Sequence, residues 1–600
     1  MRGLESPLRL RAAGLVASVL VAAGAYGAGA LPGRDPGAGL RGPGTPGAGF
    51  WLGLAAWVVG VALLATAWWR LGRRLDGLTT RWLLVTAALW ALPLLLAPPL
   101  ASRDVYSYAC QGELWRTGVD PYTTGATGGG CPWAGAVPDL WRDTPTPYGP
   151  VAVALSGAAA AVARAIGGPE DRQLLAAVTL LRAVALVGGL LLIGYAGRLA
   201  RATGVDPARA RWLAALSPLV AVNLVSGAHN DALTAGLTVA ALAIAAQPAR
   251  ATDAAHFRAA QAHDPPRAHA ATQSPRATQA LTEAPVPGPA QAHHEPQAPD
   301  RTHAHQESQT PDPAQAHHGS RSPGVARALR GVLVAGALLG LAVAVKVTAL
   351  VALPFVALLA ARRIGGRGGR WRGVAVGGAL VTGAGAAVFA VASLATGLGL
   401  GWIAALSDTG RLVQWTSLPT GVGMAAGYVL RLAGHGGSVD AAVDAARIAG
   451  VAALAIIGLA LCWRALRATL TARHDAEPHT PKPEPLEPDS LEPGPRRTIV
   501  AACGWALAAT AVLLPVFYPW YALAPLAVLA CATTAGTARR LAVAAIVTTL
   551  LVLPNGLGLA VLTKLPGAVL DVLVTAAIIT AAVQRRRRSR ASPEPATGVR

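Results

Sequence analysis

Charged residues are scarce in this sequence: Asp, Glu, Lys and Arg make up 14% of its 600 residues, whereas hydrophobic residues make up 53%. A soluble protein of this length would divide into several domains with charged surfaces, so the composition excludes that class. Apolar runs of 17 to 30 residues recur along the chain instead. Each run can cross the roughly 30 Å hydrocarbon core of a bilayer as a helix. Because the runs are unbroken and do not alternate as in a transmembrane β-barrel, we predict an all-α polytopic membrane protein.

Two further absences narrow the function. Only three of the 51 basic residues are lysines, and the arginines behind the formal net charge of +21 lie largely in short loops between apolar runs. Membrane topology explains such placement, so we predict no nucleic-acid partner. The sequence also lacks a Gly-rich strand–turn–helix and an Asp-x-Asp motif in a soluble domain, which argues against a nucleotide-sugar substrate. We expect no cofactor; no cluster of ligands calls for a divalent metal, and the sequence leaves that point open.

The apolar runs predict fourteen membrane crossings. The first run follows a basic start and also fits the pattern of a signal peptide, although its length favours an uncleaved span. The predicted spans are 12–31, 50–69, 82–100, 174–197, 212–228, 231–247, 329–345, 347–361, 373–395, 441–463, 498–516, 520–536, 540–556 and 566–584.

Arginine-rich loops predict the orientation of these spans, because short cytoplasmic loops carry an excess of basic residues. All the basic loops fall on the cytoplasmic side if two further apolar segments, 150–166 and 419–433, do not cross the membrane. Each of the two is rich in Gly and Ala and follows a proline turn, which is typical of a re-entrant or interfacial helix. Both termini are then cytoplasmic, and the large loop 101–149 is extracytoplasmic.

Two low-complexity stretches interrupt the membrane parts. Residues 248–328 hold nine of the thirteen histidines, and residues 473–497 are rich in Pro and Glu. Neither can bury enough apolar surface to fold alone, so we expect two disordered cytoplasmic segments; the irregular histidine spacing argues against a specific metal site. The remaining predicted parts are the N-terminal spans 1–100, the loop 101–149, the membrane bundle 150–247 and 329–472, the C-terminal spans 498–584 and the basic tail 585–600.

The predicted topology brings four polar clusters to the outer face. The first is Arg103–Asp104, which directly follows an apolar run and opens a loop crowded with Tyr and Trp. A carboxylate at the bilayer boundary can serve as a general base, whereas the structural alternative is a helix-terminating Asp paired with Arg103. The aromatic side chains either anchor short helices at the interface or offer flat faces to a sugar.

The other three clusters are "GAHND" (227–231), Lys346 within an apolar run, and "FYPWY" (517–521). Polar groups at membrane depth are costly and usually face a bundle interior or a wet cavity. Lysine also binds phosphate as a point charge. A short surface turn, a lysine that reaches the interface and simple aromatic anchoring are the structural alternatives. The outer loop 407–417, with Asp408, Arg411 and Trp415, is equally ambiguous.

Two of the five cysteines, Cys110 and Cys131, fall in the extracytoplasmic loop. A disulfide between them would be favoured in an oxidising compartment and would stabilise the fold by about 3 kcal/mol. Two free thiols are the alternative. The remaining cysteines lie in predicted spans, where they are expected to pack as small apolar residues.

The motifs "RDVYSY…QG…G.DPY", "PYGP", "GAHNDAL", "AVKVTALVALPF" and "YPWY" occur in this order. Together they resemble the actinobacterial polyprenol-phosphate-mannose-dependent α-1,6-mannosyltransferases, which are GT-C glycosyltransferases of lipomannan and lipoarabinomannan assembly. The resemblance runs from about Trp82 to the final span and skips both low-complexity stretches. The long His/Pro-rich insert departs from the family pattern. The resemblance implies a GT-C-type helical bundle whose first outer loop is catalytic.

The resemblance also implies a polyprenyl-phosphate-mannose donor, a lipid-anchored mannan acceptor and an inverting reaction at the outer face of the plasma membrane. Asp104 matches the family's outer-loop acidic residue, the base that activates the acceptor hydroxyl. From polarity and topology we add Arg103 and Lys346 as ligands of the donor phosphate. The predicted sugar- or acceptor-binding residues are Tyr106, Tyr148, His229, Asn230, Asp231, Trp415, Tyr518, Trp520 and Tyr521.

Two other functions remain open at this point. A GT-C enzyme that uses another lipid-linked sugar, such as arabinofuranose, or that makes another linkage would share these motifs. A transporter would suit re-entrant helices and intramembrane charges. Transporters, however, often carry internal repeats and bind substrate at mid-membrane, whereas this chain has no convincing repeat and its polar clusters lie at one surface.

Overall fold

The computed structural model describes residues 6–33, 47–247, 323–364, 369–410, 412–471 and 494–591. Within these residues the regular structure is entirely helical, apart from one isolated β-bridge between Val552 and Gly558. The chain is therefore an all-α polytopic membrane protein, as the composition predicts. Most of the His-rich insert, the Pro/Glu-rich linker and the end of the basic tail lie outside the described residues.

Nine helices in the described residues are long and apolar enough to cross a membrane. Two of them comprise two helical elements each, because a 3-10 turn precedes the α-helix. They are α1 (Pro7–Ala28), α2 (Ala48–Leu71), α7 (Glu170–Thr203), α11 (Pro323–Val345), η5 (Val347–Ala352) with α12 (Leu353–Ile364), α13 (Arg370–Thr396), η6 (Gly436–Ser438) with α16 (Val439–Thr471), α17 (Pro495–Leu513) and α21 (Lys564–Ala591).

The other five predicted spans are short or broken helices, so the number of crossings stays a prediction. They are α3 (Thr80–Leu96), α8 (Pro207–Ala215) with η3 (Val220–Ser226), α9 (Asp231–Ala245), η7 (Pro519–Ala522) with α18 (Leu523–Ala530), and α19 (Ala535–Leu550). The two segments predicted not to cross form α6 (Pro150–Ile166) and α15 (Leu418–Leu432), of 17 and 15 residues. The remaining elements are α4 (Asp104–Arg116), η2 (Ala134–Ala136), α5 (Asp139–Arg142), α14 (Trp402–Thr409), η8 (Pro554–Gly556) and α20 (Leu559–Leu562).

The single span predicted for 212–228 is broken in the structure. Pro218 disfavours helical backbone in the residue before it and lacks an N–H, so α8 ends and a separate seven-residue π-helix, η3, follows. The Gly227 N–H closes η3 on the Val222 carbonyl. Ala228 then takes a left-handed conformation with φ of 53°, and α9 begins three residues later. π-helical turns are rare in proteins and frequently occur at functional sites.

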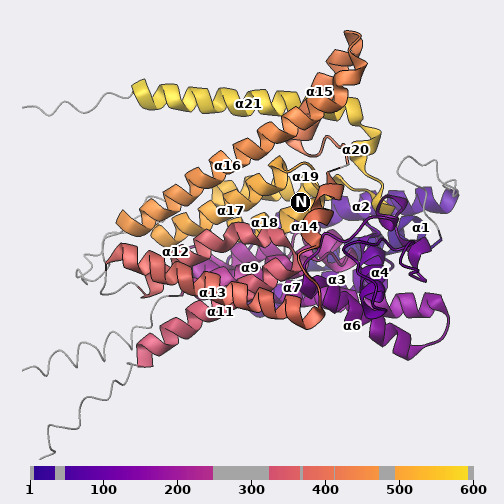
Figure 1. Ribbon diagram of the computed structural model, residues 1–600, viewed down its shortest axis with the longest axis horizontal. Helices are drawn as coiled ribbons and strands as arrows, with labels where there is room; N and C mark the ends of the chain where they lie inside the picture. Colours follow the sequence, from indigo (N-terminus) through magenta and orange to yellow (C-terminus); the bar gives the residue numbers. More distant parts are fainter. Residues whose placement is uncertain are drawn as a thin grey trace, which may run out of the picture. The chain divides into compact units, whose positions relative to one another are not determined.

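Glycine allows the helices beside this break to approach closely. A Cβ atom added at Gly188 of α7 would lie 2.3 Å from the Ala232 carbonyl oxygen of α9, and one at Gly236 of α9 would lie 2.5 Å from the Gly188 oxygen. Helices in a membrane associate mainly through van der Waals packing, because lipid is as apolar as their side chains. Small residues favour this packing because they let the two backbones approach closely. Figure 1 shows α7 and α9 together in the bundle. This contact fixes the N-terminus of α9, where Asp231 lies.

A buried arginine holds α7 to the segments on either side of the break. Arg182 donates hydrogen bonds to the carbonyls of Leu95 and Ala97, at the end of α3, and to that of Ser226, at the end of η3. These carbonyls have no partner within their own helix, so the guanidinium satisfies acceptors that would otherwise be buried and unpaired. The start of the loop and the end of η3 are therefore fixed to one helix.

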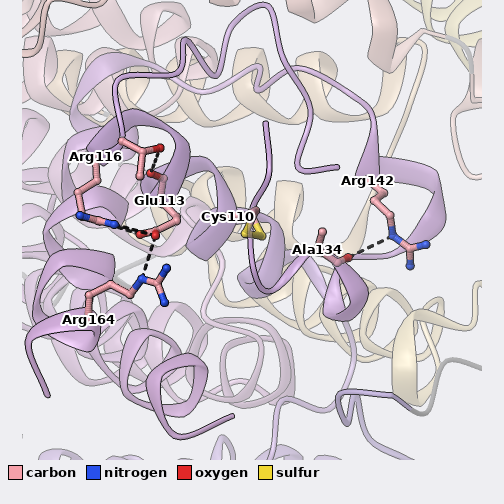
Figure 2. The surroundings of a disulfide bond; sticks show 8 residues. Cys110, Glu113, Arg116, Ala134, Arg142 and Arg164 are labelled. Atoms are coloured by element: carbon pink, nitrogen blue, oxygen red, sulfur yellow. Dashed lines mark hydrogen bonds and ion pairs between the residues drawn. A yellow bond between two sulfur atoms is a disulfide. The ribbon is translucent and has the colours of Figure 1, made fainter. Parts of the chain in front are cut away.

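The loop between α3 and α6 is braced from both sides, as Figure 2 shows. A disulfide joins Cys110 of α4 to Cys131, with the two Cα atoms 5.6 Å apart. One turn along α4, Glu113 accepts from Arg116 at 2.8 Å and from Arg164 of α6 at 3.0 Å. Because Glu113 exposes only 3% of its side chain, losing either partner would leave a buried charge poorly compensated.

Two alanine substitutions in α7 test the close approach of α7 and α9. Gly188→Ala should lower the melting temperature of the detergent-solubilised protein, because its Cβ would collide with backbone and cost about 1–3 kcal/mol. Gly194→Ala is the matched control, since its Cβ would meet nothing within 4 Å. There the better helix propensity of alanine should leave the protein equally stable or more stable. Equal melting temperatures for both variants would show that the α7–α9 contact is loose.

Candidate functional site

One face of α4 carries a row of polar side chains. Asp104, Ser107, Tyr108 and Gln111 follow the i, i+3, i+4, i+7 spacing that places residues on one side of a helix. All four line the same cavity, which has an empty volume of about 520 Å³ including its open mouth. The rest of the lining comes from Trp141, Thr144, Pro145, Pro147, Tyr148, Tyr518, Trp520 and Tyr521.

Asp104 is the first residue of α4 and is the carboxylate of this cavity. Its backbone N–H donates to Ser102 Oγ at 3.0 Å, and its side chain is 14% exposed. Burial raises the pKa of Asp104 from 3.8 to about 6, against the lowering effects of Ser102 and the Lys346 charge. The neighbouring charge of Asp231 adds to the rise. A carboxylate with a pKa near 6 is a stronger base than a free aspartate and is still ionised at neutral pH.

His229 faces Asp104 and belongs to a stack of three rings. Its Nδ1 lies 3.6 Å from Asp104 Oδ2 and 3.4 Å from the Tyr108 hydroxyl. Its ring stacks on Trp520 with centroids 3.8 Å apart, and Trp520 stacks on Tyr518 at 4.6 Å. Burial, reinforced by the charge of Lys346, lowers the pKa of His229 well below 6.5, so the ring is neutral. A hydrogen on Nδ1 would face the carboxylate and orient it.

Lys346 and Asp231 form a buried ion pair beside the cavity. Lys346 Nζ lies 2.9 and 2.8 Å from the two carboxylate oxygens of Asp231. The same ammonium lies 4.0 Å from the ring centroid of Tyr521 and 5.8 Å from that of Tyr148. Lys346 is the only residue between α11 and η5, and its extended backbone ends the helix there. The helical backbone is therefore interrupted at the residue that carries the buried cation.

The structure brings most of the predicted site residues together, but it places four of them elsewhere. The guanidinium of Arg103 donates to Asn555 Oδ1 and to the carbonyls of Ala136 and Leu31, so it holds separate segments together. These contacts support a scaffold role, and its phosphate-binding role stays a prediction. The other three are Tyr106, whose hydroxyl donates to the Ala30 carbonyl, Trp415, whose Nε1 donates to Thr563, and Asn230, which precedes α9 and does not line the cavity.

Several cavity residues were not among the predicted site residues. Ser107, Tyr108 and Gln111 share the face of α4 with Asp104, so helical spacing from Asp104 would have found them. Trp141 and Thr144 follow an irregular loop, and no sequence period places them. Asp408 and Arg411, which the sequence left ambiguous, carry side chains outside the described part of the chain.

No group of three His, Cys, Asp or Glu side chains that could hold a metal ion is found in the described residues. The polar groups that line the cavity are instead one carboxylate, the side chains of Ser107, Gln111 and Thr144, and a set of Tyr and Trp rings, with the buried ion pair beside them. Flat aromatic faces ringed by hydrogen-bonding groups suit a sugar, and the lone carboxylate suits proton transfer.

Two family models match the chain. The model described as "Alpha-(1->6)-mannopyranosyltransferase, N-terminal domain" matches residues 11–273, and that described as "MptB C-terminal domain" matches residues 494–585. The alpha-(1->6)-mannopyranosyltransferase Rv1459c of Mycobacterium tuberculosis is 33% identical over 566 residues, which cover 92% of this chain and 82% of the relative. The chain belongs to the alpha-(1->6)-mannopyranosyltransferase family.

Other relatives agree with this assignment. Alpha-(1->6)-mannopyranosyltransferase A of M. tuberculosis is 28% identical over 87% of this chain and 80% of its own length. Alpha-(1->6)-mannopyranosyltransferase B of Corynebacterium glutamicum is 26% identical over 86% of this chain and 72% of its own length. No solved structure matches. The resemblance seen in the sequence is confirmed, and the protein is a membrane-embedded mannosyltransferase.

The family models fall on both halves of the cavity. The first spans Asp104, His229 and Asp231, and the second spans the rings of Tyr518 and Trp520. Lys346 lies between the two matched regions and contacts both, the first through its ion pair with Asp231 and the second through the ring of Tyr521. The cavity is therefore built from parts of the chain more than 400 residues apart, and both parts lie in regions that the family models match.

Removing one partner of the ion pair should separate its structural and chemical roles. Lys346→Met should destabilise the protein by roughly 3–5 kcal/mol, because Asp231 would keep a buried charge without a partner. The double variant Asp231→Asn/Lys346→Met should regain most of the melting temperature. Mannosyl transfer by the double variant should stay roughly two orders of magnitude below wild type if the ammonium acts on the substrate. Full activity would make the pair purely structural.

The pH dependence of transfer should report the raised pKa of Asp104. Only the deprotonated carboxylate of Asp104 can accept a proton, so activity requires a pH above the pKa of this group. kcat/KM should therefore fall tenfold per pH unit below about 6, where an unshifted aspartate would sustain activity to about 4. The titratable groups that face the carboxyl are His229, Asp231 and Lys346. A profile that stays flat down to pH 5 would assign the proton transfer to another group.

Proposed function

We propose that the protein transfers mannose from polyprenyl-phosphate-mannose to a lipid-anchored mannan, forming an α-1,6 linkage at the outer face of the plasma membrane. The observation that carries this proposal is the position of Asp104, a partly exposed carboxylate in an aromatic cavity just beyond the end of an apolar helix. Family membership supports mannose as the sugar, and the names of the relatives support the α-1,6 linkage.

The proposed step is a single displacement with inversion. The Asp104 carboxylate takes the proton of the acceptor 6-hydroxyl as that oxygen forms a bond to the anomeric carbon of mannose. The bond between this carbon and the phosphate oxygen breaks, and its electrons leave with polyprenyl phosphate. A β-linked donor thus yields an α-linked product, and Asp104 then releases its proton to water. A phosphate leaving group needs no general acid, but its added negative charge favours a nearby cation.

Lys346 is the cation in the best place for this role. Two of its hydrogens are directed to Asp231, and its ammonium also lies over the rings of Tyr148 and Tyr521, which line the cavity. Asp231 would hold the ammonium in position and keep it charged, while Tyr148 and Tyr521 would border the phosphate. Arg103 is the neighbour of Asp104 in the chain, but its described partners are protein acceptors.

The membrane setting supports a lipid-linked donor. Two apolar helices end close to the site in the chain, α3 shortly before Asp104 and α11 directly before Lys346. A prenyl tail could remain in the bilayer while its phosphate enters the cavity. The arginine-rich loops support the outer face as the location, since they concentrate on the side predicted to be cytoplasmic.

Membranes that contain wild type or Asp104→Asn provide the test. They would receive radiolabelled polyprenyl-phosphate-mannose and a synthetic α-1,6-dimannoside, with the protein level checked by immunoblot. Wild type should form the trimannoside, and Asp104→Asn should lose about two or more orders of magnitude, because a general base contributes roughly 10²–10⁴.

Asp143→Asn is the matched control, because Asp143 is exposed in the same loop and does not line the cavity. It should keep wild-type activity. Transfer that survives in Asp104→Asn would move the base elsewhere. An expressed wild type that transfers arabinose but not mannose would overturn the donor assignment.

A further inference from the structure

Asp104 lies where two cavities meet. The first is the aromatic cavity described above, here called the α4 cavity. A second, larger cavity has an empty volume of about 990 Å³ and also contains Asp104. Both cavities share the rings of Trp141, Tyr518 and Trp520 as a common wall. A single base thus faces two adjoining spaces, an arrangement that suits a reaction between two large substrates.

The second cavity is formed largely by the C-terminal part of the chain, so we call it the C-terminal cavity. One wall is the short segment 551–561, which includes η8, and another is the loop segment 138–141. Gln414 and Thr416 contribute polar groups, and Phe517 adds a further aromatic face. Alternating polar and aromatic surfaces of this kind suit a polyhydroxylated chain, whose sugar rings present both flat apolar faces and hydroxyl rims.

The α4 cavity is better suited to the charged donor. Lys346 lies against two of its residues, Tyr148 and Tyr521. The C-terminal cavity contains Arg103, but this guanidinium already donates to Asn555 and to two carbonyls. Lys346 is paired with Asp231 as well, so the cations alone do not separate the two sides, and the place available to the prenyl tail decides between them.

An apolar groove next to Lys346 favours this side for a lipid-linked phosphate. Val347, the following residue, lines a groove with an empty volume of about 790 Å³ between α11, η5 and α13. Apart from Thr382 the groove is lined by apolar residues and glycine. The backbone N–H of Gly149, next to Tyr148, donates to the Val345 carbonyl and so joins the α4 cavity to this part of the bundle. An apolar tail and a phosphate could thus be accommodated within a few residues of each other, beside the α4 cavity.

We propose that the C-terminal cavity is the acceptor subsite and that the segment 551–561 determines how the mannan chain is bound. The proposal rests on the proposed function. The acceptor hydroxyl would reach Asp104 from the C-terminal cavity, and the donor would reach it from the α4 cavity. Sugar units behind the reacting one would extend along the segment 551–561, so this cavity would set the preferred acceptor length.

Filling the C-terminal cavity tests the proposal. Val561 lines it and is half-buried, so Val561→Trp would occupy space that the acceptor needs. We expect KM for an α-1,6-mannoside acceptor to rise by about tenfold or more, with KM for polyprenyl-phosphate-mannose unchanged within about twofold. The rise should be larger for a tetramannoside than for a dimannoside. Val547→Trp, at an exposed position of α19, is the matched control and should change neither KM.

A second variant guards against misfolding of the first. Gly558 also lines the cavity, and a Cβ there would meet only Val561 Cγ2 at 3.6 Å, so Gly558→Val should fold and raise the acceptor KM in the same way. A higher donor KM with an unchanged acceptor KM in either variant would overturn the assignment. An expressed wild type that transfers no mannose would instead overturn the proposed function on which the assignment rests.

Discussion

A buried ion pair fixes the two breaks in the bundle relative to each other. Lys346 lies between α11 and η5, and Asp231 is the first residue of α9, immediately after the chain leaves η3. Neither charge could remain in an apolar bundle alone, because an unpaired ion costs several kcal/mol there. The pair therefore requires the two breaks to stay side by side. The contact of α7 with α9 through Gly188 fixes one of them in turn.

The interrupted helices explain why polar chemistry is available in so apolar a protein. A continuous helix satisfies its own backbone and presents only side chains, whereas a break exposes N–H and C=O groups that need partners. Arg182 supplies such partners at the ends of α3 and η3, and Arg103 supplies them at Leu31 and Ala136. The break between α8 and α9 can thus turn His229 and Asp231 toward the site while Arg182 satisfies a carbonyl at the end of η3.

Much of the fold and part of the site could be predicted from the sequence. The apolar runs predicted the helical membrane class, and polar residues inside those runs predicted His229, Asp231 and Lys346 as neighbours of Asp104. The break in the predicted span 212–228 was missed, because the run is largely apolar and its length suits a membrane span, although Pro218 ends its helix. The partners of Arg103 could not be predicted either, since Asn555 lies 452 residues away in the chain.

The roles of single aromatic residues were the least predictable part. Tyr106 and Tyr108 are two residues apart, so a helix turns them to different sides. Tyr106 therefore donates to Ala30 in the scaffold, whereas Tyr108 lines the cavity beside Tyr148. Composition alone treats the two side chains alike, and only the helical phase of α4 separates them.

The disulfide between Cys110 and Cys131 makes the site dependent on its surroundings in a further way. Cys110 lies in the middle of α4, the helix that carries Asp104, Tyr108 and Gln111, so the bond ties this helix to the rest of the loop. Bonds of this kind persist only where the compartment is oxidising. A chain made or purified under strong thiol reductant would keep its transmembrane helices and lose the restraint on α4. The activity of a preparation should therefore depend on its redox state, as it does on the choice of detergent or lipid.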